Sequence, residues 1–218
     1  MRKYLCFGIG LMLFMACNLG RDKIPLTPEL KKEMENRQIK KLSEAQIFAK
    51  AFELGRQIAD DSQKTLAANL KSAISTKGIS EAIQFCNVAA MPLVDSLSLQ
   101  YQATIRRVSF KVRNPKNQPD SLEKEILEAY QANLEKMLPS QPNVQQIDDQ
   151  YLLYTQPILL NNPLCLQCHG QVGNEIKKED YDLLKKLYPQ DSAIDHQTGD
   201  LRGMWSIKLS KKAIINSM

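Results

Sequence analysis

The chain has 218 residues, of which 43% are hydrophobic and 24% charged, values that are ordinary for one globular domain with a substantial core. The formal net charge is +5, and without Arg2 and Lys3 it falls to +3. So small a charge, with no basic stripe interleaved with aromatic residues, does not indicate a nucleic-acid partner, although it is compatible with an acidic redox partner.

The first 16 residues have the features of an export signal. Arg2 and Lys3 form a basic start, and residues 5–15 form an apolar stretch that is too short to span a bilayer. A small residue then precedes Cys17, as in bacterial lipoprotein signals. We therefore expect residues 1–16 to be a lipoprotein signal peptide and Cys17 to carry the lipid, which places the protein in the cell envelope, facing the periplasm. The alternative is an ordinary signal peptide that happens to end near a cysteine.

Residues 17–42 are expected to form a tether and an N-terminal helix. Thr27 can cap this helix, and Pro28 suits its first position. A second, long helix is predicted from Ser43 to about Lys77, because apolar residues recur there at helical spacing. A glycine follows directly and breaks the pattern.

A third helix begins at Ser80, and Pro92 is expected to end or kink it. Its apolar residues share one face. They are Ile79, Ala82, Ile83, Cys86, Ala89, Ala90 and Leu93. Cys86 therefore points inward among small side chains. It is either a buried core cysteine or a thiolate ligand to a metal, and the neighbouring alanines would allow a flat group to approach the helix.

Residues 104–113 alternate between apolar and polar side chains, which predicts a strand with one buried face. Val108, Phe110 and Val112 lie on the apolar side. The other side carries the cations Arg107, Lys111 and Arg113. These three residues either form a solvated face or pair with the carboxylates of a cofactor, for which the arginine fork is well shaped.

The rest of the chain mixes helices and strands. The patterns predict a helix over residues 121–138, a hairpin over 144–160, a short helix over 174–187 and a last strand over 204–209. Several helices followed by strands mixed with helices favour an α+β fold with a mostly antiparallel sheet.

Residues 162–170 read Asn-Pro-Leu-Cys-Leu-Gln-Cys-His-Gly. Cys165, Cys168 and His169 form the C-x-x-C-H pattern of covalent c-type haem attachment, in which each thiol adds to a vinyl group and the histidine binds the iron. The flanking proline and glycine favour a loop. The alternatives are half of a structural zinc site or a thiol redox pair. The sequence offers neither a second C-x-x-C nor a C-x-x-C before a βαβ pattern, so we expect one covalent haem c.

Four segments resemble a bacterial family of exported single-haem domains with a PAS-like fold, long described as a domain of unknown function. They are residues 82–86, 105–117, 163–170 and 199–206, and the most specific are the Arg-Asn-Pro-Lys-Asn and Gly-Asp-Leu-Arg-Gly stretches. The resemblance implies a sheet of about five strands flanked by helices, carrying one c-type haem. Because it covers about residues 43–209, we expect the haem-binding domain to occupy residues 43–218.

The resemblance also implies that His169 and Cys86 are the two axial ligands. The family has Ala-Pro soon after the cysteine, whereas this chain has a slightly shifted Ala-Ala-Met-Pro, which makes Met91 a competing ligand. We expect a lipid-anchored, cytochrome-like sensor of redox state or gases that acts through an unidentified redox or signalling protein. The alternative is an electron-transfer cytochrome whose sixth ligand is Met91, Met204 or His196. His196 is the weakest of these candidates, because residues 195–199 read as an exposed turn. An enzyme is not expected, because the chain has no recognisable catalytic arrangement.

Overall fold

The computed structural model describes residues 27–36 and 42–218. The expected signal peptide and Cys17 lie outside the described residues. The chain divides into two units, Met1–Ile39 and Lys40–Met218. In the first unit, helix α1 begins where the sequence predicts, because the Thr27 hydroxyl accepts a hydrogen bond from the backbone N–H of Leu30 at 3.2 Å.

The α1 helix spans Pro28–Asn36. The helices of the second unit are α2 (Glu44–Lys77), α3 (Ile79–Val88), α4 (Ala90–Tyr101), η1 (Pro115–Asn117), α5 (Ser121–Glu135), α6 (Pro163–His169), α7 (Lys178–Leu187) and α8 (Lys211–Asn216). Its strands are β1 (Thr104–Val108), β2 (Asn143–Gln146), β3 (Tyr151–Leu159) and β4 (Leu201–Ser210). Helices combined with one antiparallel sheet confirm the expected α+β class.

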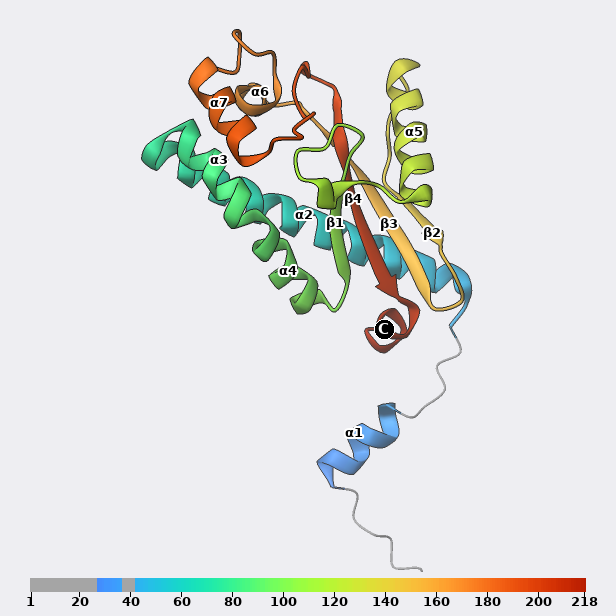
Figure 1. Ribbon diagram of the computed structural model, residues 1–218. Helices are drawn as coiled ribbons and strands as arrows, with labels where there is room; N and C mark the ends of the chain where they lie inside the picture. The colour runs from blue at the N-terminus through green and yellow to red at the C-terminus, as the bar shows by residue number, and fades with distance from the viewer. Residues whose placement is uncertain (1–26, 37–41) are drawn as a thin grey trace, which may run out of the picture. The chain divides into compact units, whose positions relative to one another are not determined.

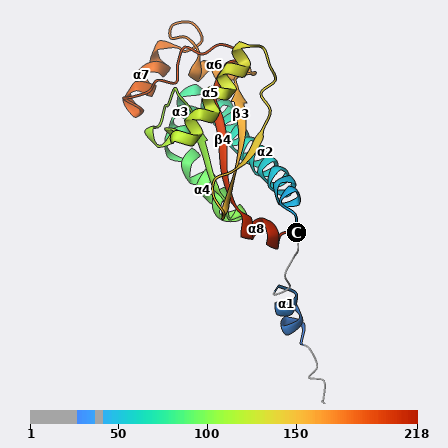
Figure 2. The ribbon, with the colours of Figure 1, turned by 90° about the vertical axis from the view of Figure 1, so that its right-hand side faces the viewer.

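The sheet has the strand order β1-β4-β3-β2, and all neighbouring strands are antiparallel. The described residues form four strands, one fewer than the family resemblance implies. Helices cover both faces of the sheet, with α2 and α4 on one side and α5 on the other (Figures 1 and 2). Strand β4 shows the consequence: Trp205 packs in the cluster under α2, whereas Met204 packs in the cluster under α5.

The long helix α2 confirms the expected span, and its first turn explains where it starts. Ser43 and Gln46 form a capping box, in which each side chain accepts a hydrogen bond from the backbone N–H of the other. Farther along, Gly55 faces Tyr154 of β3 so closely that a Cβ atom would overlap the ring. The glycine therefore sets how closely α2 approaches the sheet.

The prediction that Pro92 closes or kinks the third helix is only partly correct. The chain bends earlier, at Ala89, where α3 and α4 meet at 49°. Pro92 lies in the first turn of α4, where a backbone N–H has no helical partner, so the proline costs no hydrogen bond there. Across the described residues, no single helix has the length and apolar composition to cross a membrane, and the bent pair of α3 and α4 meets that test together.

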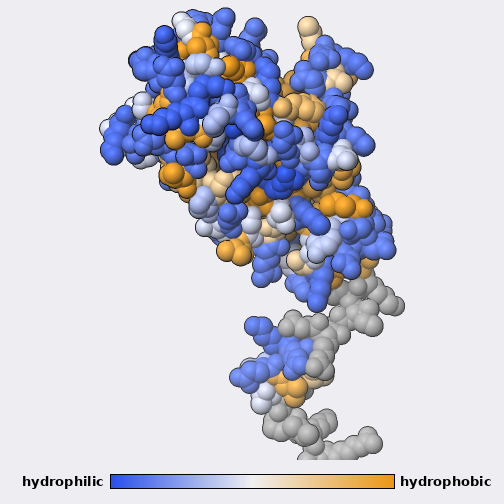
Figure 3. Space-filling view, viewed as in Figure 1, coloured by the Kyte–Doolittle hydropathy of each residue, from blue (hydrophilic) through white to orange (hydrophobic). Residues whose placement is uncertain are grey.

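The predicted strand over residues 104–113 is too long. Pairing with β4 ends at Val108, and the backbone N–H of Ser109 donates instead to the carbonyl of Asn117 at 3.2 Å. Phe110, predicted to lie on the buried face, is 44% exposed. On the face of the second unit that Figure 3 shows, hydrophobic residues form small separate patches among hydrophilic ones.

Candidate haem-attachment site

The C-x-x-C-H motif lies beside a cavity of about 210 Å³. The cavity is bounded by the second half of α2 and by α3, the end of β1, α6, and the chain around Tyr188 and Arg202. The residues in its wall that carry sulfur, nitrogen or hydroxyl groups are Gln63, Cys86, Met91, Arg107, Ser109, Arg113, Asn114, Asn117, Cys165, Cys168, His169, Tyr188 and Arg202. The fold thus brings together residues that are more than 100 positions apart in the chain.

A second hollow of about 490 Å³ lies on the α5 face of the sheet. None of the predicted site residues lines it. Its charged residues include Arg106 and Glu123, which are paired with each other at 2.8 Å. The cavity at the motif is therefore the candidate site.

The motif forms a short helix, α6, and not the loop predicted from the flanking proline and glycine. Asn162 caps this helix by accepting from the backbone N–H of Leu164 at 2.9 Å, and Pro163 occupies its first turn. In a helix, residues three apart lie on one face. Cys165 and Cys168 are therefore presented to the cavity together, and both are free thiols.

His169, the last residue of α6, has a fixed orientation. Its Nδ1 lies 2.8 Å from the carbonyl oxygen of Ala193. Since a carbonyl can only accept, Nδ1 carries the proton, and Nε2 presents a lone pair. Burial, together with the nearby Arg202 and Arg113, holds the pKa of His169 well below its usual range, so the ring is neutral. A neutral imidazole with Nδ1–H on a backbone carbonyl is the form that binds metals.

The segment that supplies the Ala193 carbonyl is held by Arg113. The Arg113 guanidinium pairs with Asp191 at 3.1 Å and donates to the carbonyls of Cys168 at 2.6 Å and Ala193 at 3.2 Å. The backbone N–H of His196 also donates to the carbonyl of His169 at 2.9 Å. Arg113 therefore lines the cavity, as a cofactor partner would, but its hydrogen bonds also hold α6 against this segment.

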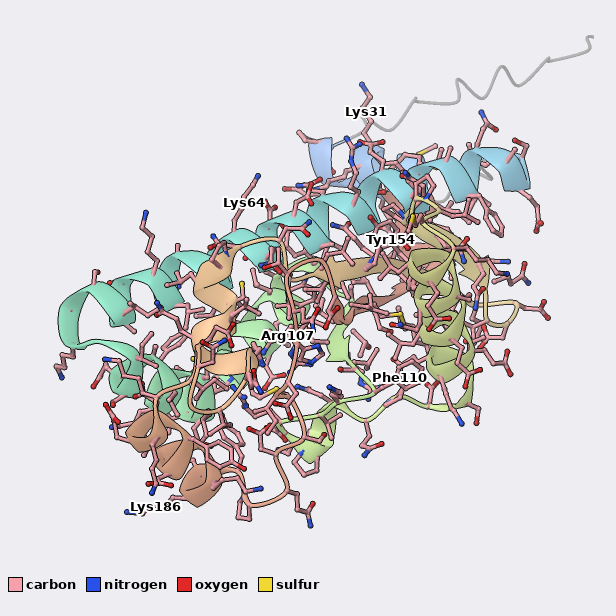
Figure 4. The ribbon with its side chains drawn as sticks, turned by 90° about the horizontal axis from the view of Figure 1, so that it is seen from above. Lys31, Lys64, Arg107, Phe110, Tyr154 and Lys186 are labelled. Carbon is pink, nitrogen blue, oxygen red and sulfur yellow. The ribbon has the colours of Figure 1, made fainter. Side chains whose placement is uncertain are left out.

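Arg107 lies among the inner side chains of the second unit, whereas Lys64 and Lys186 project outward from it (Figure 4). The guanidinium of Arg107 lies 5.8 Å from the centre of the Trp205 ring. Burial lowers the pKa of Arg107, and the neighbouring Cys86 and Tyr188 act in the opposite direction. Within the described part of the chain, Arg107 has no carboxylate in ion-pair distance.

The structure does not bring Lys111 into the cavity. Its ammonium group donates to the carbonyls of Ile194 at 3.1 Å and Asp195 at 3.4 Å, and the residue is exposed. The prediction assumed that the strand continues to Arg113 with a regular alternation. Because β1 ends at Val108, that alternation no longer decides which way Lys111 faces.

Cys86 lies in the cavity wall, on the apolar face of α3 that the sequence predicts. The buried side chains of Ala82 and Ile83 lie on the same face. Burial raises the pKa of the Cys86 thiol, and Arg107 and Arg113 partly offset this. The thiol is thus protonated in the metal-free chain, but its environment includes two cations that favour the thiolate.

Of the three other residues considered as sixth ligands, only one lines the cavity. Met91 lines the cavity. Met204 does not, because it is fully buried between β4 and α5, on the other face of the sheet. His196 lies outside the cavity wall, with its ring centre 6.3 Å from that of His169. The expectation that His196 sits in an exposed turn is wrong: it is 7% exposed, because its segment folds back onto α6.

The sequence assigned no role to Arg202, although it stands in the Gly-Asp-Leu-Arg-Gly stretch. Its Nε lies 3.5 Å from Nε2 of His169, and its Nη1 donates to the Ser109 hydroxyl at 2.9 Å and to the Lys111 carbonyl at 3.0 Å. Burial, with smaller contributions from Arg113 and Arg107, lowers the pKa of Arg202 to about 9. The presence of this arginine in one of the most specific segments of the family resemblance was the sequence signal that could have identified it as a site residue.

The described residues contain no group of three or more His, Cys, Asp and Glu side chains that could hold a metal ion by themselves. Fold and site instead define an α+β domain in which one cavity brings together the two thiols of the motif, a third thiol, a fixed imidazole and three arginines.

The model of the Tll0287-like family matches residues 34–210, and the chain belongs to this family. The match confirms the family resemblance in the sequence, which covers nearly the same residues. Among solved structures, the chain is similar to the crystal structure of the cyanobacterial heme-protein Tll0287, with 22% sequence identity and a TM-score of 0.47. The similarity covers 67% of this chain and 91% of the other. The comparison with curated proteins finds no match.

Proposed function

We propose that the protein binds one haem c, attached through Cys165 and Cys168, with His169 and Cys86 as the two axial ligands of the iron. One observation carries this proposal. The two thiols of the motif, the neutral imidazole and the separate thiol of α3 all line the same cavity. Membership of the Tll0287-like family supports the proposal, because the protein that gives the family its name is described as a heme-protein.

The charges in the cavity wall fit this cofactor. Arg107, Arg113 and Arg202 line the cavity, and Asp191 is the carboxylate paired with one of them. Two guanidinium groups are thus left without a carboxylate from the described residues, and haem carries two carboxylates. Arginine binds such groups through parallel hydrogen bonds. We infer that Arg107 and Arg202 bind the haem carboxylates, whereas Arg113 chiefly holds the histidine segment.

The cavity volume sets a condition on this fit. Small-molecule sites usually measure about 300–1,000 Å³, and the cavity has about 210 Å³. Side chains at its wall must therefore move when a macrocycle enters, or part of the macrocycle stays outside. Leu164, which lines the cavity and is 36% exposed, is placed to move.

We propose that the protein uses this site to sense redox state or a small gas. A bound haem would supply one-electron redox chemistry and an iron that binds carbon monoxide or nitric oxide. Cys86 would hold ferric iron more firmly than ferrous iron, because a thiolate donates strongly to the higher charge. Release of Cys86 would then free the coordination position on the side opposite His169. The protein would pass the signal to a redox or signalling partner and is not expected to be an enzyme.

An electron-transfer cytochrome is the second candidate. The observation that favours it is Met91, which lines the same cavity as Cys86. If Met91 binds the iron in both oxidation states, access to the iron does not change with reduction, and the protein would only carry electrons.

Absorption spectra of the full-length protein, produced with haem maturation machinery, test the proposal. We expect covalent haem in the wild type, its loss when Cys165 and Cys168 are both replaced by Ala, and a ferric thiolate spectrum that disappears in Cys86→Ala. The Met91→Leu variant is the matched control and should keep the wild-type spectrum. Sensitivity to Met91→Leu but not to Cys86→Ala would establish the electron carrier instead. A wild type without covalent haem would overturn the proposal.

We further propose that the protein is exported and anchored in a membrane of the cell envelope through lipid on Cys17. The support is the sequence of the first 17 residues, with its basic start, apolar stretch and small residue before the cysteine.

A further inference from the structure

Arg202 and His169 come together because of an irregularity in the sheet. In the pairing of β3 with β4, Ile158 lies opposite Gly203 and Leu159 lies opposite Leu201, so Arg202 is the extra residue of a β-bulge. A bulge changes the direction of a side chain at the end of a ladder. Here it allows the Arg202 guanidinium to reach the cavity next to His169.

Ser109 holds the bulge in place. Its hydroxyl donates to the backbone carbonyl of Arg202 at 2.7 Å and accepts from Nη1 of the same residue at 2.9 Å. Gly203 contributes too, because a Cβ atom there would overlap the carbonyl oxygen of Val108. Arg202 is therefore anchored at one end of its guanidinium, while Nε–H points at His169.

The partner of that N–H is the nitrogen that binds a metal. Because Nδ1 of His169 donates to Ala193, the lone pair of the ring lies on Nε2. A metal on an imidazole nitrogen lies about 2 Å from it, along the lone pair. The Arg202 Nε–H donates to this same nitrogen, with Nε 3.5 Å from Nε2. Since Nε2 has a single lone pair, it cannot accept this hydrogen bond and bind iron at the same time.

We propose that Arg202 is a positioning residue that takes the place of the iron in the haem-free chain, that iron binding displaces its Nε–H from His169, and that the displaced guanidinium then binds a haem carboxylate. This inference rests on the proposed function. Before loading, Arg202 keeps the Nε2 lone pair of His169 directed into the cavity. After loading, the bonds to Ser109 and Lys111 keep the guanidinium at the cavity wall.

The first test uses the haem-free, full-length chain and ¹⁵N NMR of the histidine rings. In the wild type, the Nε2 resonance of His169 should show a hydrogen-bonded acceptor. In Arg202→Met it should move toward the position of a free lone pair, with Nδ1 still protonated. The control is Arg107→Met, which removes another arginine from the same wall but makes no contact with His169. An Nε2 resonance that is the same in the wild type and Arg202→Met would overturn the inference.

The second test separates displacement from carboxylate binding. The same haem-free proteins are titrated with haem and with its dimethyl ester, which lacks free carboxylates, and binding is followed by absorbance. Without the competing N–H, Arg202→Met should bind the ester about three- to tenfold more tightly than the wild type. Its advantage should shrink or reverse with haem itself. Equal affinities of both proteins for the ester would contradict displacement.

The two proposals fail in different ways. If neither form of haem binds the wild type, the proposed function fails and displacement fails with it, whereas the NMR comparison still decides whether Arg202 holds Nε2. If Arg202→Met does not fold, Arg202→Lys replaces it. A lysine keeps the charge but lacks the fork that reaches Ser109 and His169 together, so the Nε2 resonance should move in this variant too.

Discussion

Arg106 and Arg107 are consecutive in β1, but their guanidinium groups lie on opposite faces of the sheet. Arg106 pairs with Glu123 of α5 at 2.8 Å, whereas Arg107 lies over Trp205, on the side of the cavity. Alternation along a strand requires this separation. Two adjacent residues of the same type thus have different roles: Arg106 pairs with a buried carboxylate of α5, and Arg107 lines the cavity.

Substituting the two arginines separately should show this division. Arg106→Met leaves the Glu123 carboxylate, which is 3% exposed, without its counter-charge. Since Arg106 itself is about one-third exposed, the loss should be about 2–3 kcal/mol of unfolding free energy. Arg107→Met removes a charge that has no described carboxylate partner, so it should cost less than about 1 kcal/mol but weaken haem binding. Urea unfolding of the haem-free proteins measures the loss of stability, and haem titration measures the loss of affinity. If the same variant showed the larger loss in both assays, the two arginines would not have separate roles.

Asp191→Ala should destabilise the protein by about 3 kcal/mol, because it leaves the nearly buried Arg113 guanidinium without a carboxylate. The Ala193 carbonyl that orients His169 lies two residues away, so haem loading should fall as well. The control is Glu128→Gln, which breaks the exposed pair with Lys124 and should cost no more than about 0.5 kcal/mol. Urea unfolding compares the two variants, and equal losses would mean that the Asp191 pair does not hold this segment.

Gly55→Ala should destabilise the protein, although the same change at an exposed helical site usually stabilises it. The added methyl would overlap the Tyr154 ring, and overpacking of this kind costs about 1–3 kcal/mol. Thermal unfolding measures the change. As a comparison on the same helix, Ala67→Gly at an exposed position should cost about 1 kcal/mol through helix propensity alone. A stabilised Gly55→Ala protein would show that α2 can move away from the sheet without loss.

Cys17→Ser should release the protein from the membrane fraction and abolish incorporation of labelled fatty acid, because the proposed acceptor of the lipid is gone. Cys6→Ser, within the same 17 residues, is the control and should leave both unchanged. Labelling followed by membrane fractionation gives the answer. A Cys17→Ser protein that still carries the label would rule out this residue as the anchor.

Local signals were sufficient for several features of the fold. Ser43 caps α2 where the pattern predicts, the helix α5 lies within its predicted range, and the hairpin of β2 and β3 begins one residue before its predicted range, at Asn143. Cys86 was placed on the inner face of its helix by spacing alone, and it does line the cavity. Each of these depends on residues that are close together in the chain.

The features that sequence reasoning missed depend on contacts between distant segments. β1 ends where the backbone of Ser109 bonds to Asn117 and its hydroxyl bonds to Arg202, 93 positions later. The predictions for Phe110 and Lys111 assumed that the strand continues past this point. The bulge at Arg202 exists only where β4 pairs with β3. The burial of His196 requires its segment to fold back onto α6. Alternation and helical spacing contain no information about such contacts.

The 34 residues of α2 make it about 50 Å long. Gln63, Leu70 and Ile74, from its second half, line the cavity. Near its start, α8 packs against it, and the C-terminus lies at that end (Figure 1). The chain therefore enters and leaves the second unit at one end, and the cavity lies toward the other. An affinity tag, surface linker or fluorescent protein joined at the C-terminus would leave the cavity open to solution, so the protein could be immobilised on an electrode without covering it.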